Sequence, residues 1–270
     1  MDLLTAAILG LVQALTEFLP VSSSGHLVLT KALLGVEVSH GAAFEVAVHF
    51  GTLLSVLVIF RTEVMALFRA LGRLLRSPGT IAQQRAENQY TRMGLAIVVG
   101  CVPAGVVGLT MKDTLERAFD SPTLVCGALV ATGLVLLATL KAPEGSSEVG
   151  LKGAVLIGLA QAVAILPGVS RSGATIAAAQ FLGVDRNLAA RYSFLLSLPV
   201  IAGATLLKVK DLIDAPPQGE VLMALLLGAL VAFVAGMAAL AWLLRLVRSG
   251  WFAHFGWYCL AVGIGGLSVL

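Results

Sequence analysis

Charged residues are scarce in this chain. Only 12% of its 270 residues are Asp, Glu, Lys or Arg, whereas 58% are hydrophobic and the mean hydropathy is +0.96. Soluble globular domains carry about 25% charged residues. This deficit argues against an ordinary soluble enzyme and predicts a polytopic membrane protein, because only lipid would cover so much apolar surface.

Cysteines and nucleotide-binding motifs are also few. Cys101, Cys126 and Cys259 lie in apolar segments, at spacings that match neither a disulfide framework nor a zinc site. There is no Walker loop, and the basic residues follow the loops instead of forming a patch, so we expect no nucleic-acid partner. The first residues lack the basic start of a signal peptide, so we expect the first apolar segment to belong to the mature fold.

Ten apolar segments make up most of the chain, and we expect all of them to be helical. Four are short and form two pairs, 3–19 with 24–35 and 151–166 with 173–183, each pair joined by a break rich in Pro, Ser and Gly. Such short segments are poor bilayer spans, and non-helical backbone at membrane depth is tolerated only inside protein or beside a watery cavity. We therefore predict an all-α polytopic membrane protein with two re-entrant helical hairpins and about six full transmembrane helices. The six spans are 41–60, 93–111, 122–140, 188–207, 221–244 and 251–270.

The distribution of basic residues predicts the orientation of these helices. Six arginines lie in or bound the loop 61–92, and the positive-inside rule therefore places this loop in the cytoplasm. With that choice, twelve basic residues fall on the cytoplasmic side and five on the outer side, and Arg171 alone lies within the membrane. Because fully crossing hairpins would give the same sides, the charges support the orientation without proving re-entrance.

An imperfect repeat links the two short pairs. The run GLVQALTEFLPVSSSGH begins at Gly10, and the run GLAQAVAILPGVSRSGAT begins at Gly158. Gln, Pro, paired Ser and Gly agree in order, with one length adjustment around Pro20 and Pro167. Each run takes an apolar helix, breaks it at Pro and fills the break with hydroxyl groups, which suggests a buried polar site assembled from two related parts.

The repeat also predicts how the halves are arranged. One hairpin and three spans in each half make an odd number of crossings, so the second half would be inserted upside down relative to the first. We expect one integral membrane domain, 1–270, composed of inverted-topology repeats at roughly 1–140 and 151–270 that are joined by 141–150. In such an arrangement the two hairpins enter from opposite faces and their tips meet near the midplane.

The first break carries the side chains best suited to catalysis. Glu17 lies one turn after Gln13, and a carboxylate inside a membrane protein marks function by default. Glu17 could bind a divalent cation or accept a proton, and Gln13 could orient a phosphate or a metal-bound water. Ser23 could be a nucleophile deprotonated by His26, or His26 could attack phosphorus itself or protonate the leaving group. The flanking hydroxyl groups are candidate substrate ligands, although helix capping alone would also explain them; they belong to Ser22 and Ser24.

The second break carries a cation in place of the carboxylate. Arg171 interrupts an apolar region, and its guanidinium fork matches phosphate oxygens in bidentate fashion. The hydroxyl groups of Ser170, Ser172 and Thr175 and the amides at the start of the next helix would add donors to an anion. Gly173 would let the backbone approach such a ligand closely. The alternative is that Arg171 only pairs with Glu17.

Other polar and aromatic residues give weaker indications. Glu45 and His49 form an i, i+4 pair that could line the same cavity, or could equally form an internal hydrogen-bonded pair. His40 and His254 are expected at the membrane interfaces. An aromatic belt is expected near the end of the chain, from Trp251, Phe252, Trp257 and Tyr258.

The two breaks together resemble one known family. Gln13-x-x-x-Glu17 before the first break and the run from Pro167 to Thr175 are similar to the (E/Q)xxxE and PGxSRSxxT elements of the bacterial undecaprenyl-diphosphatases, the bacitracin-resistance type. The resemblance covers the whole chain. It implies hydrolysis of undecaprenyl diphosphate to undecaprenyl phosphate and inorganic phosphate, which recycles the lipid carrier of peptidoglycan synthesis.

The same resemblance implies particular roles and a location. Glu17, His26 and Arg171 would be the key side chains, Ser23 the candidate nucleophile, and the hydroxyl groups of the second break would surround the diphosphate. A divalent cation, Mg²⁺ or Ca²⁺, would assist, and the site would be reached from the periplasmic side of the bacterial cytoplasmic (inner) membrane. Whether the chain forms a homodimer stays open. Position 13 is Gln where many members have Glu, so proton transfer would depend on Glu17 or His26.

Two rival functions fit part of this pattern. Inverted repeats with broken helices are typical of secondary transporters, and a carrier of lipid phosphates or phosphate ions would need the same arginine and hydroxyl groups. A second class of membrane lipid phosphatases also uses Ser-Gly-His and Ser-Arg motifs. That class requires a further His after the Ser-Arg element, and no His follows Arg171 at a suitable distance.

Overall fold

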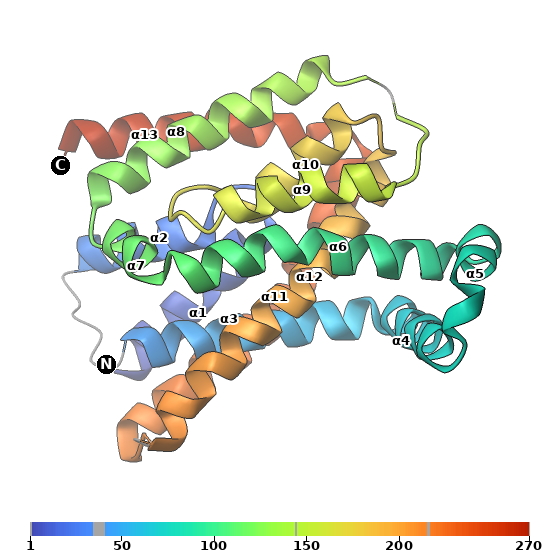
Figure 1. Cartoon of the computed structure of the whole chain (residues 1–270). Coiled ribbons are helices and arrows are strands. Elements are labelled where there is room, and N and C mark those ends of the chain that lie inside the picture. The colour runs from blue at the N-terminus through green and yellow to red at the C-terminus, as the bar shows by residue number, and fades with distance from the viewer. Residues whose placement is uncertain (1, 35–40, 144, 215–216, 270) are drawn as a thin grey trace.

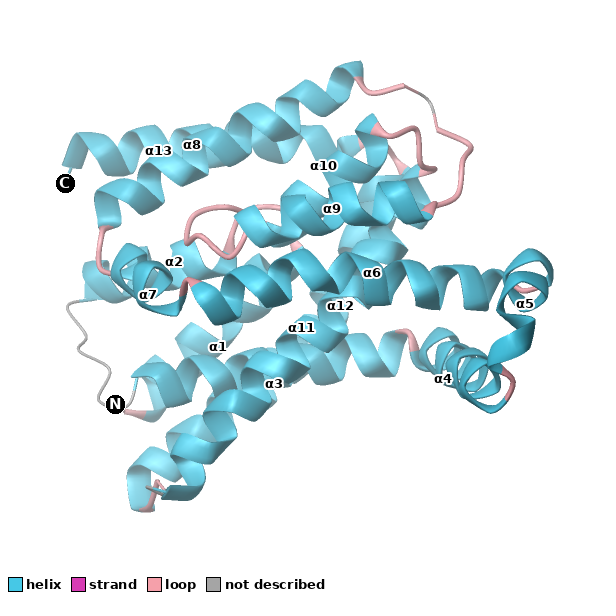
Figure 2. Ribbon diagram, viewed as in Figure 1, coloured by secondary structure: helices cyan, strands magenta, loops and turns pink. Residues whose placement is uncertain are grey.

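The computed structural model describes residues 2–34, 41–143, 145–214 and 217–269, and these residues fold almost entirely into helices (Figures 1 and 2). Across these ranges, the only β contact is a single bridge between Ser147 and Val184. The α-helices are α1 Leu3–Phe18, α2 Ser23–Leu34, α3 Gly41–Ile59, α4 Arg61–Arg76, α5 Ile81–Glu87, α6 Gln89–Thr110, α7 Lys112–Phe119, α8 Pro122–Ala138, α9 Leu151–Val163, α10 Arg171–Phe181, α11 Arg186–Asp214, α12 Gly219–Arg248 and α13 Phe255–Val269. Short 3₁₀ helices occupy Pro78–Thr80, Thr139–Lys141 and Trp251–His254.

Helix length and composition confirm a multi-pass membrane protein. Within the described residues, five helical segments are long and apolar enough to cross a bilayer. They are α6, α11, α12, α8 with the 3₁₀ turn that follows it (Pro122–Lys141), and α13 with the 3₁₀ turn that precedes it (Trp251–Val269). Helices α3 and α4 meet the same criterion only when taken together across an 83° bend, and as one span they would make a sixth crossing. The expected count of about six spans is thereby confirmed, and α1 and α9 are apolar but shorter.

The two short pairs form hairpins that enter the bundle from opposite ends. In Figure 1 the outer ends of α1 and α2 lie at the left, whereas those of α9 and α10 lie at the right. Their tips meet inside the protein: a Cβ atom at Gly25 would lie 3.2 Å from the Cα of Gly168, and the Ser172 hydroxyl donates to the carbonyl of Leu19 at 3.3 Å. This is the arrangement that the inverted-topology repeat predicts.

Glycine contacts between the halves follow the same symmetry. A Cβ atom at Gly10 of α1 would lie 2.6 Å from the carbonyl oxygen of Gly228 in α12. At the corresponding position of the second run, a Cβ at Gly158 of α9 would lie 2.4 Å from the carbonyl oxygen of Gly100 in α6. Each hairpin therefore packs closely on a long helix of the other half, as small residues allow in membrane bundles. The repeat boundaries given above stay a prediction.

The predicted loop 61–92 differs from the structure, because most of it is helical. Helix α4 turns away from α3 and buries Leu67, Ala70 and Leu74 on one side, while its other side is exposed. An ion pair between Glu63 and Arg191 at 3.0 Å ties its start to α11. The amphipathic spacing of this segment is typical of a helix lying on a surface and not of a loop.

Some helices begin or end at residues other than those predicted from the sequence. Helix α10 begins at Arg171, two residues before the predicted segment, because the Ser170 hydroxyl accepts the N–H of Gly173 at 3.0 Å and caps the helix. Helix α11 runs on to Asp214, well beyond the predicted end at 207. Pro103 and Pro199 lie inside helices α6 and α11 instead of ending them. His40, expected at an interface, lies outside the described residues.

Candidate functional site

The tip of the first hairpin is held by a strained serine. Ser22 has φ +68°, a left-handed conformation that is unusual for a residue other than glycine. Its hydroxyl accepts the N–H of Gly25 at 3.3 Å, and its carbonyl accepts the N–H of His26 at 3.1 Å. These bonds begin α2 directly after the turn, so that Ser23 stands at the helix start facing the end of α1. Strained backbone of this kind is concentrated at functional sites.

The tip of the second hairpin is held against α8. Gly168 has φ +92°, and a Cβ atom there would lie 2.4 Å from the carbonyl oxygen of Val125. The Thr132 hydroxyl donates to the Gly168 carbonyl at 3.1 Å and accepts the N–H of Ser170 at 3.2 Å. Glycine is therefore required at this turn, and the turn presents Arg171 as the first residue of α10.

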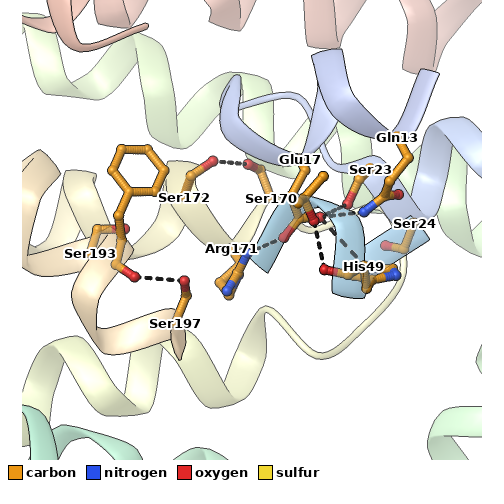
Figure 3. Close-up of polar contacts among 12 residues, drawn as sticks. Gln13, Glu17, Ser23, Ser24, His49, Ser170, Arg171, Ser172, Ser193 and Ser197 are labelled. Carbon is orange, nitrogen blue, oxygen red and sulfur yellow. Dashed lines mark hydrogen bonds and ion pairs between the residues drawn. The ribbon is translucent and has the colours of Figure 1, made fainter. Parts of the chain in front are cut away.

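Glu17 and Arg171 join the two tips. An Nη2–H of Arg171 donates to Oε1 of Glu17 in an ion pair that connects positions 154 residues apart (Figure 3). The other carboxylate oxygen, Oε2, accepts the Gln13 amide at 2.9 Å and the Ser23 hydroxyl at 2.6 Å. Glu17 is buried, so these donors replace the water that its charge would otherwise need. The expected meeting of the two breaks is thus seen, with Glu17 at its centre.

A third element contributes His49 to the same carboxylate. Nε2 of His49, on α3, lies 3.6 Å from Oε2 of Glu17 (Figure 3). Its Nδ1 lies 2.7 Å from the backbone carbonyl of Glu45. Since Nδ1 must donate to that carbonyl, the ring is oriented with Nε2 toward Glu17. The i, i+4 spacing of His49 with Glu45 was only a weak indication, because a single histidine in an apolar helix does not reveal which helix it faces.

His26 lies elsewhere than the predicted Ser23–His26 pair requires. Its Nδ1 lies 2.8 Å from the carbonyl of Ser22, and its Nε2 lies 2.8 Å from the hydroxyl of Tyr258 on α13. The Ser23 hydroxyl instead donates to Glu17. The structure therefore does not contain the predicted hydrogen bond between Ser23 and His26. Both ring nitrogens of His26 have other partners.

Two of the four residues expected in the aromatic belt make contacts inside the protein. Trp251 and Trp257 are largely exposed, as a belt requires, but Phe252 is buried and Tyr258 stacks on His26. His254 lies beside Trp251 in the turn before α13, at an exposed position. Sequence reasoning assigned Tyr258 to the belt and did not foresee its contact with His26.

The remaining hydroxyl groups divide into two sets. Ser170 and Ser172 lie 3.3 Å apart at the start of α10, and Ser24 lies 3.3 Å from Ser22 at the first tip, so all four remain beside the junction of the hairpins. The Thr175 hydroxyl instead contacts the carbonyl of Arg171 and the hydroxyl of a serine on α11. Thr175 therefore packs α10 onto α11 in this structure, whereas it was expected to contact substrate.

Two polar atoms at the junction are buried without a partner. They are Nη1 of Arg171 and Oε1 of Gln13, a donor and an acceptor that flank the Glu17 carboxylate. Most buried polar atoms in proteins are hydrogen-bonded, so each exception requires an explanation. A bound anion on the guanidinium and a water or cation on the amide oxygen would satisfy both.

The side chains at the junction can be compared with the ligands that the predicted divalent cation needs. Across the described residues, no group of three or more His, Cys, Asp and Glu side chains is placed to hold a metal ion. Mg²⁺, however, is commonly held by only one or two protein ligands together with substrate phosphates. At the junction, Oε1 of Gln13 is without a partner, whereas both oxygens of Glu17 already accept donors, so Glu17 would have to exchange one of these donors to share such an ion.

Comparison with known proteins places this geometry in a family. The family model for bacitracin resistance protein BacA matches residues 6–265. An undecaprenyl-diphosphatase of Desulforapulum autotrophicum is 42% identical over 98% of this chain and 97% of its own length. Similar proteins of the same name from Salinibacter ruber and Methanobrevibacter smithii are 41% and 39% identical, each over 98% of this chain and over 98% and 96% of their own lengths. The chain therefore belongs to the BacA family of bacitracin resistance proteins.

Proposed function

We propose that this protein hydrolyses undecaprenyl diphosphate to undecaprenyl phosphate and inorganic phosphate. The observation that carries the proposal is the buried pair of Glu17 and Arg171, formed between two hairpin tips, in which one guanidinium nitrogen stays without a partner. Relatives at about 40% identity bear the name of this enzyme. The products would return the lipid carrier to cell-wall synthesis and confer resistance to bacitracin.

Arg171 holds the terminal phosphate in this proposal. Its Nη2 is occupied by Glu17, so the free Nη1 and the N-terminal amides of α10 are the donors left for a phosphate oxygen. The hydroxyl groups of Ser170 and Ser172 lie at the same helix start. Phosphoryl transfer depends mostly on positioning and charge stabilisation, and this group of donors supplies both.

Ser23 is the nucleophile and Glu17 its base. The Ser23 hydroxyl donates to Glu17 at 2.6 Å, so the carboxylate takes the proton as the oxygen attacks the terminal phosphorus. The anhydride P–O bond breaks, and its electron pair leaves with undecaprenyl phosphate. Water then hydrolyses the phosphoserine, which releases inorganic phosphate and restores the hydroxyl. His49, which is partly exposed and 3.6 Å from Glu17, passes the proton to solvent.

His26 acts in this scheme as a positioning residue. Its two ring nitrogens tie the first tip to α13 through Tyr258 and close the turn at Ser22. This fixes the start of α2, and therefore the direction of the Ser23 hydroxyl. A role in direct attack on phosphorus would require one of these bonds to break.

A divalent cation, Mg²⁺ or Ca²⁺, would be held by Glu17 and by Oε1 of Gln13, with phosphate oxygens completing its shell. When bound, it would neutralise charge that builds up on the diphosphate. The neutral amide at position 13 leaves Glu17 as the single carboxylate in this set.

The substrate approaches within the bacterial cytoplasmic (inner) membrane and from its periplasmic side. The cluster of arginines on α4 supports a cytoplasmic location for that end of the bundle, which makes the opposite end, where α1 and α2 enter, periplasmic (Figure 1). The polyprenyl tail would stay in lipid while the diphosphate reaches the junction of the tips.

Hydrolysis can be separated from transport in detergent, where no compartments exist. Purified protein is incubated with undecaprenyl diphosphate in micelles, and inorganic phosphate and lipid products are quantified. We expect one phosphate for each undecaprenyl phosphate formed. Binding of the lipid without phosphate release would favour a transporter. The relatives are named as diphosphatases, which argues against that alternative.

A further inference from the structure

Helix α4 packs beside the start of α6 instead of continuing α3. The bend between the two helices is 83°, and in Figure 1 α4 is seen nearly end-on at the right, while α3 runs across the view. With α3 taken as the crossing part of this bent pair, α4 would lie roughly parallel to the membrane surface. The ion pair between Glu63 and Arg191 and the buried Leu67, Ala70 and Leu74 hold it in place.

The face of α4 that points away from the bundle is both apolar and basic. Met65, Phe68 and Leu75 are 52%, 68% and 85% exposed. Arg69 and Arg73 are exposed on the same helix, together with Arg76 in its last turn. A helix with apolar side chains and arginines on its outer face is typical of one that lies in the headgroup region of a bilayer.

The arginines surround a notch in this face. A shallow hollow of about 410 Å³, open to the outside, is lined by Phe68, Arg69, Gly72, Arg73 and Arg76. Gly72 leaves the notch open, because a Cβ atom there would meet nothing within 4 Å. In the described part of the chain, none of the three arginines forms an ion pair with a carboxylate. Their charges therefore remain available to an outside anion.

We propose that this notch binds the phosphate headgroup of an anionic phospholipid from the cytoplasmic leaflet. Guanidinium forks match the phosphate oxygens, and the exposed Phe68, Met65 and Leu75 would contact the acyl chains beside it. A free phosphate ion would use the arginines but would leave these apolar side chains in water. The lipid would anchor α4, and this site is separate from the junction of the hairpins.

Binding of a fluorescent phosphatidylglycerol to the purified full-length protein in zwitterionic micelles tests the proposal. The test variant combines R69Q, R73Q and R76Q, and the control combines R85Q, K141Q and K152Q, which removes equal charge from exposed positions at the same end of the bundle. Because each basic residue near an anionic surface contributes about five-fold in affinity, the test variant should bind on the order of a hundred-fold more weakly. The control should bind within about five-fold of the parent protein.

Three further arms make the result specific. Gly72→Leu fills the notch without changing charge, so it should weaken binding about ten-fold. Glycerol phosphate, which has the headgroup chemistry without acyl chains, should compete only at concentrations at least a hundred-fold higher. Arg171→Ala should leave this binding unchanged.

Four results would overturn the proposal. Equal losses in the test and control variants would mean that only general charge attraction is involved. Unchanged binding by the Gly72→Leu variant would show that the notch is not the binding site. Glycerol phosphate that competes as well as the lipid would show that the ligand is a free anion. Loss of binding in Arg171→Ala alone would place the lipid at the hairpin junction.

Discussion

The hydroxyl of Tyr258 lies 2.8 Å from Nε2 of His26, and the two rings stack with their centroids 5.6 Å apart and their planes at 10°. Because Nδ1 of His26 faces the carbonyl of Ser22, it must donate, which leaves Nε2 to accept from the tyrosine. This contact connects α13, in the second half, to the tip of the first hairpin. It makes Tyr258 part of the support for the site.

The first prediction concerns that support. Tyr258→Phe should lower kcat about three- to ten-fold, since it removes one of the two bonds that fix His26. If Tyr258 acts through His26, the double variant with His26→Ala should be no slower than His26→Ala alone, because effects of contacting residues are not additive. A double variant that multiplies the two losses would contradict this account. Phosphate release by the four proteins completes the cycle.

The second prediction separates two neighbouring serines. Ser23→Ala should lower phosphate release at least about a thousand-fold, because it removes the hydroxyl that donates to Glu17. Ser24→Ala removes a hydroxyl that contacts Ser22 at 3.3 Å and not Glu17, and should stay within about ten-fold of the parent rate. Substantial turnover by Ser23→Ala would mean that water, and not Ser23, attacks phosphorus.

The third prediction tests the close contact between the halves. A methyl group at Gly158 would lie 2.4 Å from the backbone of Gly100, so Gly158→Ala should destabilise the protein by about 1–3 kcal/mol. Gly105→Ala in α6, where a Cβ meets nothing within 4 Å, is the matched control and should cause no loss. Thermal unfolding followed by gel filtration measures both. Equal stability of the two variants would mean that α9 and α6 are not in close contact.

The fourth prediction concerns orientation. A cysteine introduced by Ser77→Cys, directly after α4, should react with a membrane-impermeant maleimide only when the cytoplasmic side is accessible. Gln218→Cys, before α12, is its partner and should react from the periplasmic side. The reverse pattern in whole cells would overturn both the topology and the direction of substrate entry.

Much of the fold could be predicted from the sequence, because it depends on local apolar runs and on one repeat. The breaks around Pro20 and Pro167 indicated the hairpins, and the matched Gly10 and Gly158 lie at equivalent crossings in the structure. The helical nature of 61–92 was missed. Its arginines were counted as loop charges, although the spacing of Leu67, Ala70 and Leu74 shows an amphipathic helix.

The site was only partly predictable, because its contacts join residues far apart in the chain. The motifs identified Glu17 and Arg171, whose side chains do meet. They did not show that His26 turns toward Tyr258, nor that His49 approaches Glu17 from α3. Direction of a side chain depends on which helices pack together, and neither spacing nor composition specifies that packing here.

The initial rate of phosphate release from undecaprenyl diphosphate, compared between Arg171→Ala and Arg191→Ala, tests the central claim most directly. Both changes remove an arginine from an ion pair, but Arg171 pairs with the buried Glu17, whereas Arg191 pairs with Glu63 near the start of α4. Loss of a phosphate clamp should lower the rate at least about a thousand-fold, while Arg191→Ala should stay within about three-fold. A folded Arg171→Ala protein with near-normal release would contradict the proposal that the two hairpin tips form the catalytic site.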